Sequence, residues 1–128
     1  MTTIDNDPQG SDQFPVDYPR LLDERCRGKK DLAARLLRNL AEDSGPRWLV
    51  DAEGVVKTGD MANISRIGHS IKGSCKMLYA ESMVSAGMKL EKAGKAGSLQ
   101  LAGEALDDLK KAFTEACNWL QQNRELIK

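Results

Sequence analysis

The sequence predicts an all-α protein, an antiparallel up-and-down four-helix bundle with a short additional N-terminal helix. Apolar residues recur at the three-and-four spacing of an amphipathic helix in successive segments, and turns that contain Gly28, Gly59 and Gly97 separate most of those segments. No segment shows the period-two alternation of a strand. With 128 residues, the chain has the size of one domain. We expect a disordered tail over residues 1–15 and the bundle over residues 16–128.

The tail and the first helix differ in composition. Residues 1–15 contain prolines, a glycine and several Asp, Asn and Gln residues, which is typical of a mobile segment. Asp17 has a side chain suited to an N-cap, and the helix after it is expected to be short and to end before Gly28. Its helical spacing is carried by Tyr18, Leu21, Leu22 and Cys26.

A second helix should open near Lys30, and a proline interrupts its pattern. Its first apolar positions are Leu32, Ala33, Leu36, Leu37 and Leu40. Gly45-Pro46 follows, and proline inside a helix removes a backbone hydrogen bond and clashes with the preceding turn. The later apolar positions, rotated by about 130° from the earlier ones, are Trp48, Ala52, Val55 and Val56. The residues therefore predict a kink or a short break around Asp43 to Pro46.

The next helix carries the chain's one histidine opposite its apolar residues. Gly59-Asp60 forms the turn, Asp60 can cap the helix, and the helix should run to about Leu78. At about 100° per residue, the apolar residues about 160° to 220° from His69 are Ile64, Ile67, Ile71 and Leu78. A helix that packs through these residues presents His69 to water.

Two further helices complete the bundle. One is expected from about Ala80 to Ala93, and small residues on its apolar face allow close approach of a neighbour. That face consists of Met83, Ala86, Gly87 and Leu90. The last helix should run from Ser98, an N-cap candidate, to about Glu125.

The surface around His69 is cationic and open. The residues within about 60° of the imidazole are Ala62, Ser65, Arg66, Lys72, Gly73 and Lys76. Lys72 and Lys76 are within side-chain reach of the ring on a helix surface. A glycine in a helix interior costs about 1 kcal/mol relative to alanine, so Gly73 should have a compensating role. We interpret that role as clearance for another protein's surface. Space for a neighbouring helix is the alternative, and the outward angle of Gly73 disfavours it.

These residue types suit phosphoryl chemistry. An accessible imidazole is largely neutral at pH 7 and is a competent nucleophile. At about 4 Å, one unit-charge pair contributes about 1 kcal/mol in water and up to about 4 kcal/mol at an effective dielectric of 20. Lys72 could therefore steady a phosphoryl group without trapping it. A structural histidine is the usual alternative, but such a residue would share the isoleucine face.

The segment His69-Ser-Ile-Lys72-Gly73-Ser74-Cys75 resembles the H-x-L/I-K-G-S/A-S/A signature of histidine-containing phosphotransfer (HPt) domains. These four-helix modules shuttle phosphoryl groups between receiver domains. Met83 to Gly97 resembles the family's following helix, with Leu90-Glu91 in the place of its Leu-Glu pair, and the resemblance covers roughly Val16 to the C-terminus. The departures are Gly68 for the commoner alanine, Cys75 for a small residue, and Tyr79-Ala80 where a glycine is common.

The resemblance implies a phosphocarrier in a multistep phosphorelay. His69 would accept a phosphoryl group on its outer nitrogen, Nε2, Lys72 would steady the phosphoryl oxygens, and Gly73 would permit docking. The partner-binding candidates are Ala62, Ser65, Arg66 and Lys76. The partner would be the receiver domain of a response regulator or hybrid histidine kinase, and that receiver would bring the divalent metal, so no cofactor is expected on this chain. The family further implies one long helix where the residues predict a kink, and it leaves room for Glu91, expected to be an exposed or capping carboxylate, to matter near the partner.

Composition excludes several other classes. The 19 basic and 19 acidic side chains cancel, which gives no global electrostatic case for nucleic acid or an anionic membrane. The N-terminal residues lack the pattern of a signal peptide and no apolar run reaches the length of a membrane span, so we expect a cytoplasmic protein. We also expect it to be a monomer. Cys26, Cys75 and Cys117 are widely spaced and odd in number, which predicts reduced thiols and no zinc site. A nucleotide-binding glycine-rich loop is absent, so no kinase activity is expected.

Two alternatives to a phosphocarrier remain. A helical adaptor could bind and modulate a histidine kinase or response regulator without being phosphorylated. A phosphatase-like or metal-binding bundle is disfavoured because the chain has one histidine.

Overall fold

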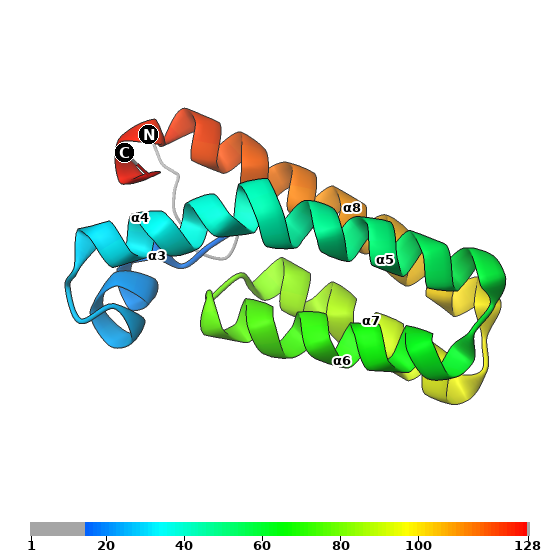
Figure 1. Ribbon diagram of the computed structural model, residues 1–128. Helices are drawn as coiled ribbons and strands as arrows, with labels where there is room; N and C mark the ends of the chain where they lie inside the picture. The colour runs from blue at the N-terminus through cyan, green and yellow to red at the C-terminus, as the bar shows by residue number, and fades with distance from the viewer. Residues whose placement is uncertain (1–14, 128) are drawn as a thin grey trace, which may run out of the picture.

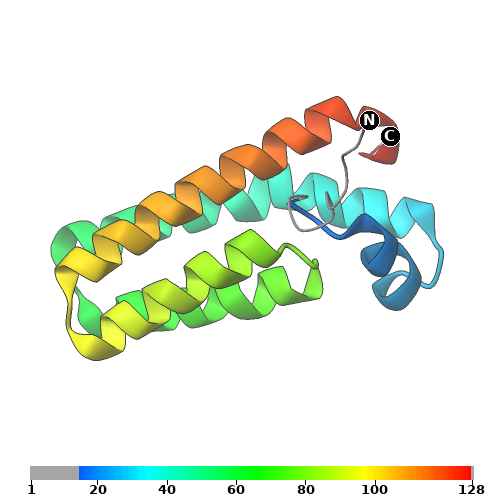
Figure 2. The ribbon, with the colours of Figure 1, turned by 180° about the vertical axis from the view of Figure 1, so that it is seen from behind.

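The computed structural model describes residues 15–127, and it confirms the predicted four-helix bundle. The first bundle helix comprises α4 (Lys30–Asn39), the π-helical segment η2 (Leu40–Ser44) and α5 (Gly45–Thr58). It is followed by α6 (Met61–Met77), α7 (Glu81–Ala96) and α8 (Leu99–Gln122). Helices α6 and α7 form a hairpin that lies against the longer pair made by α4–α5 and α8 (Figures 1 and 2). Most of the predicted tail, residues 1–14, lies outside the described residues.

Tight turns with the predicted caps join the helices in antiparallel order. Gly59 and Gly97 end α5 and α7 with φ angles of 72° and 67°, in the left-handed region that glycine enters without steric cost. The Asp60 carboxylate accepts a hydrogen bond from the backbone N–H of Asn63 at 3.2 Å, and the Ser98 hydroxyl accepts one from the N–H of Leu101 at 3.1 Å. Both side chains satisfy backbone groups that a helix N-terminus leaves open.

The proline region differs in part from the sequence prediction of a kink or a short break around Asp43 to Pro46. The short break is wrong, because the chain remains helical from Lys30 to Thr58 and α4 and α5 follow one another as a single long helix (Figure 1). The irregularity is instead the π-helical turn of η2, where the Gly45 N–H donates to the carbonyl of Leu40, five residues earlier. Pro46 lacks an N–H and crowds the turn before it. The wider turn accommodates the proline and shifts the apolar face from its α4 to its α5 position.

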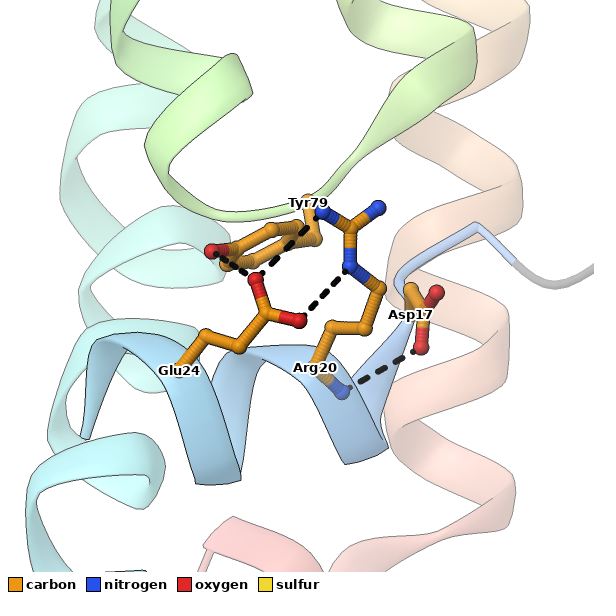
Figure 3. A network of polar contacts seen from close by, with 4 residues as sticks. All are labelled: Asp17, Arg20, Glu24 and Tyr79. Atoms are coloured by element: carbon orange, nitrogen blue, oxygen red, sulfur yellow. Dashed lines mark hydrogen bonds and ion pairs between the residues drawn. The ribbon is translucent and has the colours of Figure 1, made fainter. Parts of the chain in front are cut away.

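The N-terminal segment packs over the turn between α6 and α7. It contains α3 (Tyr18–Arg20) and the π-helical segment η1 (Leu21–Arg25), and Asp17 caps it as predicted, by accepting from the N–H of Arg20. Figure 3 shows Arg20 and Glu24 gathered around the ring of Tyr79. The Tyr79 hydroxyl donates to Glu24 at 3.2 Å, and the Arg20 guanidinium lies 4.8 Å from the ring centroid. These contacts hold Tyr79 at a φ of 56°, in the left-handed region that side-chain-bearing residues rarely adopt.

The core is formed by the apolar faces that the sequence predicted. The largest side chains with no exposed surface include Leu37, Leu40, Ile64, Ile71 and Leu90. The ends of the later helices differ slightly from expectation: α7 continues to Ala96, whereas α8 ends at Gln122 and a 3-10 turn, η3 (Arg124–Ile127), follows. Within residues 15–127, no helix is long and apolar enough to span a membrane.

Candidate functional site

The imidazole of His69 faces solvent, as the helical pattern predicted. Ile64 and Ile71, on the opposite side of α6, are fully buried, and Ile67 packs against the same core. The His69 side chain is 69% exposed. The packing of α6 through its isoleucines therefore fixes His69 on the outer surface of the bundle.

A carboxylate from the next helix holds one nitrogen of that ring. Nδ1 of His69 lies 3.0 Å from Oε2 of Glu91 on α7. An ionised carboxylate can only accept hydrogen bonds, so Nδ1 must carry the hydrogen. In the neutral ring this leaves the lone pair on Nε2, the nitrogen on the other side of the imidazole from Glu91.

Glu91 is a buried and fully paired carboxylate, so the prediction that it is exposed or a helix cap is wrong. Its side chain is 11% exposed, and its Oε1 and Oε2 lie 2.9 Å from Lys72 Nζ and 3.3 Å from Lys95 Nζ. The hydrogen bond from Lys72 is the main cause that lowers the pKa of Glu91 to about 2, with Lys95 and His69 adding to it and burial opposing it. The carboxylate is therefore ionised at any physiological pH.

The two glycines that flank His69 have opposite surroundings. A Cβ at Gly73 would have no heavy atom within 4 Å among the described residues, so the space over this residue is open. This excludes a neighbouring helix as the reason for Gly73. A Cβ at Gly68 would lie 2.7 Å from the carbonyl oxygen of Gly87 on α7, so Gly68 serves helix packing.

The predicted partner-binding residues lie along the outer side of α6 and do not all join the network around Glu91. Ala62 and Lys76 are exposed, and Ser65 is half-buried beside Gly94 of α7. Arg66 is exposed and turns towards its own helix, where both its Nε and a terminal nitrogen donate to the side-chain carbonyl of Asn63. Of the predicted cations, Lys72 is the one that shares a carboxylate with His69.

Among residues 15–127, the cysteines and acidic residues form no second centre. Cys75 is buried, and burial raises the pKa of its thiol to about 12, so the thiol stays protonated within the core. Cys26, Cys75 and Cys117 are all free thiols, as predicted. The part of the chain that the structure describes holds no group of three or more His, Cys, Asp or Glu side chains that could bind a metal ion.

The sequence contained a signal for the two residues that the prediction missed. Glu91 lies four residues after Gly87 and three before Gly94, so it shares the side of α7 that approaches α6, and Lys95 lies one turn after Glu91. A charged residue between two glycines on a packing face indicates a buried and paired carboxylate.

A comparison with protein families identifies the domain that contains these residues. A family model described as "Hpt domain" matches residues 30–119, a span that contains His69, Lys72, Glu91 and Lys95. No curated protein and no solved structure matches the sequence.

Proposed function

Because the chain belongs to the Hpt domain family, we propose that it is a histidine phosphocarrier of a multistep phosphorelay and that His69 is its phosphorylated residue. The observation that carries this proposal is the anchored and exposed ring: Nδ1 lies 3.0 Å from Glu91, while the side chain is 69% exposed. Membership of the family implies histidine phosphotransfer in general. The residue and its chemistry are proposed from the geometry.

The transfer step uses the free nitrogen as the nucleophile. The Nε2 lone pair attacks the phosphorus of a receiver's aspartyl phosphate, an N–P bond forms, and the P–O bond to the aspartate breaks so that its carboxylate leaves. The ring then carries a positive charge, with its hydrogen still on Nδ1. The ionised Glu91 stabilises that charge and holds the ring orientation, and the reverse step would pass the phosphoryl group to a second receiver.

The surrounding cations and the bare backbone have separate roles in this proposal. Lys72 and His69 bind the two oxygens of one carboxylate, so the ammonium is a neighbour of the ring and can steady the phosphoryl oxygens. Lys95, which shares the Glu91 oxygen that His69 uses, adds a second cation at this point. Gly73 leaves room for the receiver to approach.

The proposed partner is the receiver domain of a response regulator or hybrid histidine kinase. The docking surface would include Ala62, Ser65, Arg66 and Lys76. We propose that the divalent metal for the reaction comes with the receiver, that this chain acts as a cytoplasmic monomer, and that it has no kinase activity of its own.

Incubation with phosphorylated receivers tests the proposal. The expected product is one acid-labile, base-stable phosphate per chain, the stability typical of phosphohistidine. His69→Gln should leave the circular dichroism spectrum and melting curve unchanged, because the side chain is exposed, and should abolish labelling. A non-phosphorylated adaptor would take no label and would keep its effect on the partner in the His69→Gln variant.

A further inference from the structure

Three glycines form the contact between α6 and α7. Gly68 on α6 and Gly87 and Gly94 on α7 are all buried. A Cβ at Gly87 would lie 2.8 Å from the backbone nitrogen of Lys72, and one at Gly94 would lie 2.5 Å from that of Ser65. Real Cβ atoms essentially never make contacts this short, and the atoms met here belong to the backbone, which cannot move aside as a flexible side chain can.

Two other helical glycines, Gly54 and Gly103, lack this property. A Cβ added to Gly54 on α5 or to Gly103 on α8 meets no heavy atom within 4 Å among residues 15–127. A Cβ at Gly45 of α5 would also clash, with the ring of Phe113 on α8, so close packing is not confined to the α6–α7 contact. Gly54 and Gly103 provide matched controls for alanine substitution.

The glycine contact is adjacent to the His69 network in space. A Cβ at Gly68 would meet the backbone nitrogen of Glu91 and lie 2.9 Å from its Cα, and Gly87 faces the backbone of Lys72. Glu91 contacts the ring at 3.0 Å, and Lys72 contacts Glu91 at 2.9 Å. The separation of the two helices thus determines whether the Glu91 carboxylate reaches Nδ1.

The α6–α7 contact has little room for an added methyl group. Non-bonded heavy atoms prefer separations of about 3.5 Å or more, so an added methyl group would drive the helices apart by about 1 Å. A hydrogen bond of 3.0 Å that lengthens to about 4 Å is no longer a hydrogen bond.

We propose that Gly68, Gly87 and Gly94 are positioning residues for His69: they set the α6–α7 distance at which Glu91 holds the hydrogen on Nδ1 and leaves Nε2 free to react. The expected effect of these glycines on the transfer rate rests on the proposed function, whereas their expected effect on the imidazole tautomer does not.

Alanine substitution in a stabilised background tests the proposal. Gly87→Ala and Gly94→Ala are each added to a Gly54→Ala/Gly103→Ala background, whose two alanines should raise the melting temperature and leave His69 unaffected. Because the chain has one histidine, a ¹H–¹⁵N correlation of the imidazole gives one set of signals and identifies the protonated nitrogen. The second readout is the rate of phosphorylation by phosphoramidate, a small donor that needs no docking.

In the background protein, at a pH at which the ring is neutral, we expect the hydrogen on Nδ1 and none on Nε2. In Gly87→Ala and Gly94→Ala we expect a mixture of tautomers and a phosphorylation rate about tenfold lower, a loss typical of removing a hydrogen-bond partner that orients a functional histidine. Glu91→Gln should alter the signals in the same direction without changing the helix contact.

Three results would overturn the proposal. The first is wild-type imidazole signals and rate in both alanine variants. The second is a lost rate with an unchanged tautomer, and the third is unfolding even in the stabilised background, which would mean that the glycines hold the fold together and do not tune the site. A tautomer shift in a protein that accepts no phosphoryl group from any donor would instead support the positioning and refute the proposed function.

Discussion

Gly73 gives a prediction in which stability and transfer change in opposite directions. A Cβ at this position has open space among the described residues, so Gly73→Ala creates no clash. The residue lies inside α6, where alanine is favoured over glycine by about 0.8–1.0 kcal/mol. For a domain of this size that corresponds to a rise in melting temperature of about 4 °C. Under the proposed function, the same methyl group stands where a receiver would approach His69.

The two effects require separate assays. Thermal and urea unfolding give the stability of Gly73→Ala, Gly73→Leu and the control Gly103→Ala, whose added Cβ is equally unobstructed by the described residues. Transfer from a phosphorylated receiver should slow modestly in Gly73→Ala and at least tenfold in Gly73→Leu, because a misplacement of about 1 Å can cost about 10²-fold in rate. Phosphorylation by phosphoramidate should remain fast in all three.

Two outcomes would refute this reasoning. A lower melting temperature in Gly73→Ala would show that the space is not open in solution. Unchanged receiver transfer in Gly73→Leu would show that the partner does not pass over this residue, and the glycine would then need another explanation.

Three further predictions concern the residues that the structure places around Glu91 and Tyr79. Lys72→Ala should slow receiver transfer and Lys72→Arg should restore part of the rate, so full speed in Lys72→Ala would contradict a role for the cation. The pKa of Glu91 is lowered from 4.5 to about 2, so its ionised form stabilises the fold above pH 4.5 and that contribution disappears as the pH falls towards 2. The stability advantage of the wild type over Glu91→Gln, measured by urea unfolding, should therefore shrink over this range. An undiminished advantage at pH 2 would exclude the ionised Glu91 carboxylate as its cause. Tyr79→Phe removes the 3.2 Å hydrogen bond to Glu24 and should cost about 0.5–1 kcal/mol of unfolding free energy, whereas a loss above about 2 kcal/mol would mean that the ring itself had moved.

The parts of the fold that depend on a single segment could be predicted from the sequence. The outward direction of His69 follows from the positions of Ile64 and Ile71 on the same helix, and the caps at Asp60 and Ser98 follow from local residue types. Each of these features depends on contacts within a few residues. The structure confirms them for that reason.

The features that the sequence analysis missed depend on contacts between segments. The burial of Glu91 results from the close approach of α7 to α6, and a helical wheel of α7 alone gives no information about the distance between the two helices. The π-helical turn before Pro46 is a choice among several ways to accommodate a proline, and the bundle favours the one that keeps α4 and α5 continuous. Lys95 was likewise missed, because its role as a site residue depends on the position of Glu91.

The N-terminal cover affects how the protein should be produced for experiments. The family match begins at Lys30, yet Val16, Leu21 and Cys26 are 0%, 0% and 1% exposed. Each large apolar side chain contributes about 1.5–3 kcal/mol when buried, a sizeable share of the 5–15 kcal/mol that typically separates folded from unfolded domains. A recombinant fragment trimmed to the family limits would lose these side chains and the partners of Tyr79, and its failure in a transfer assay would report on its folding and not on His69.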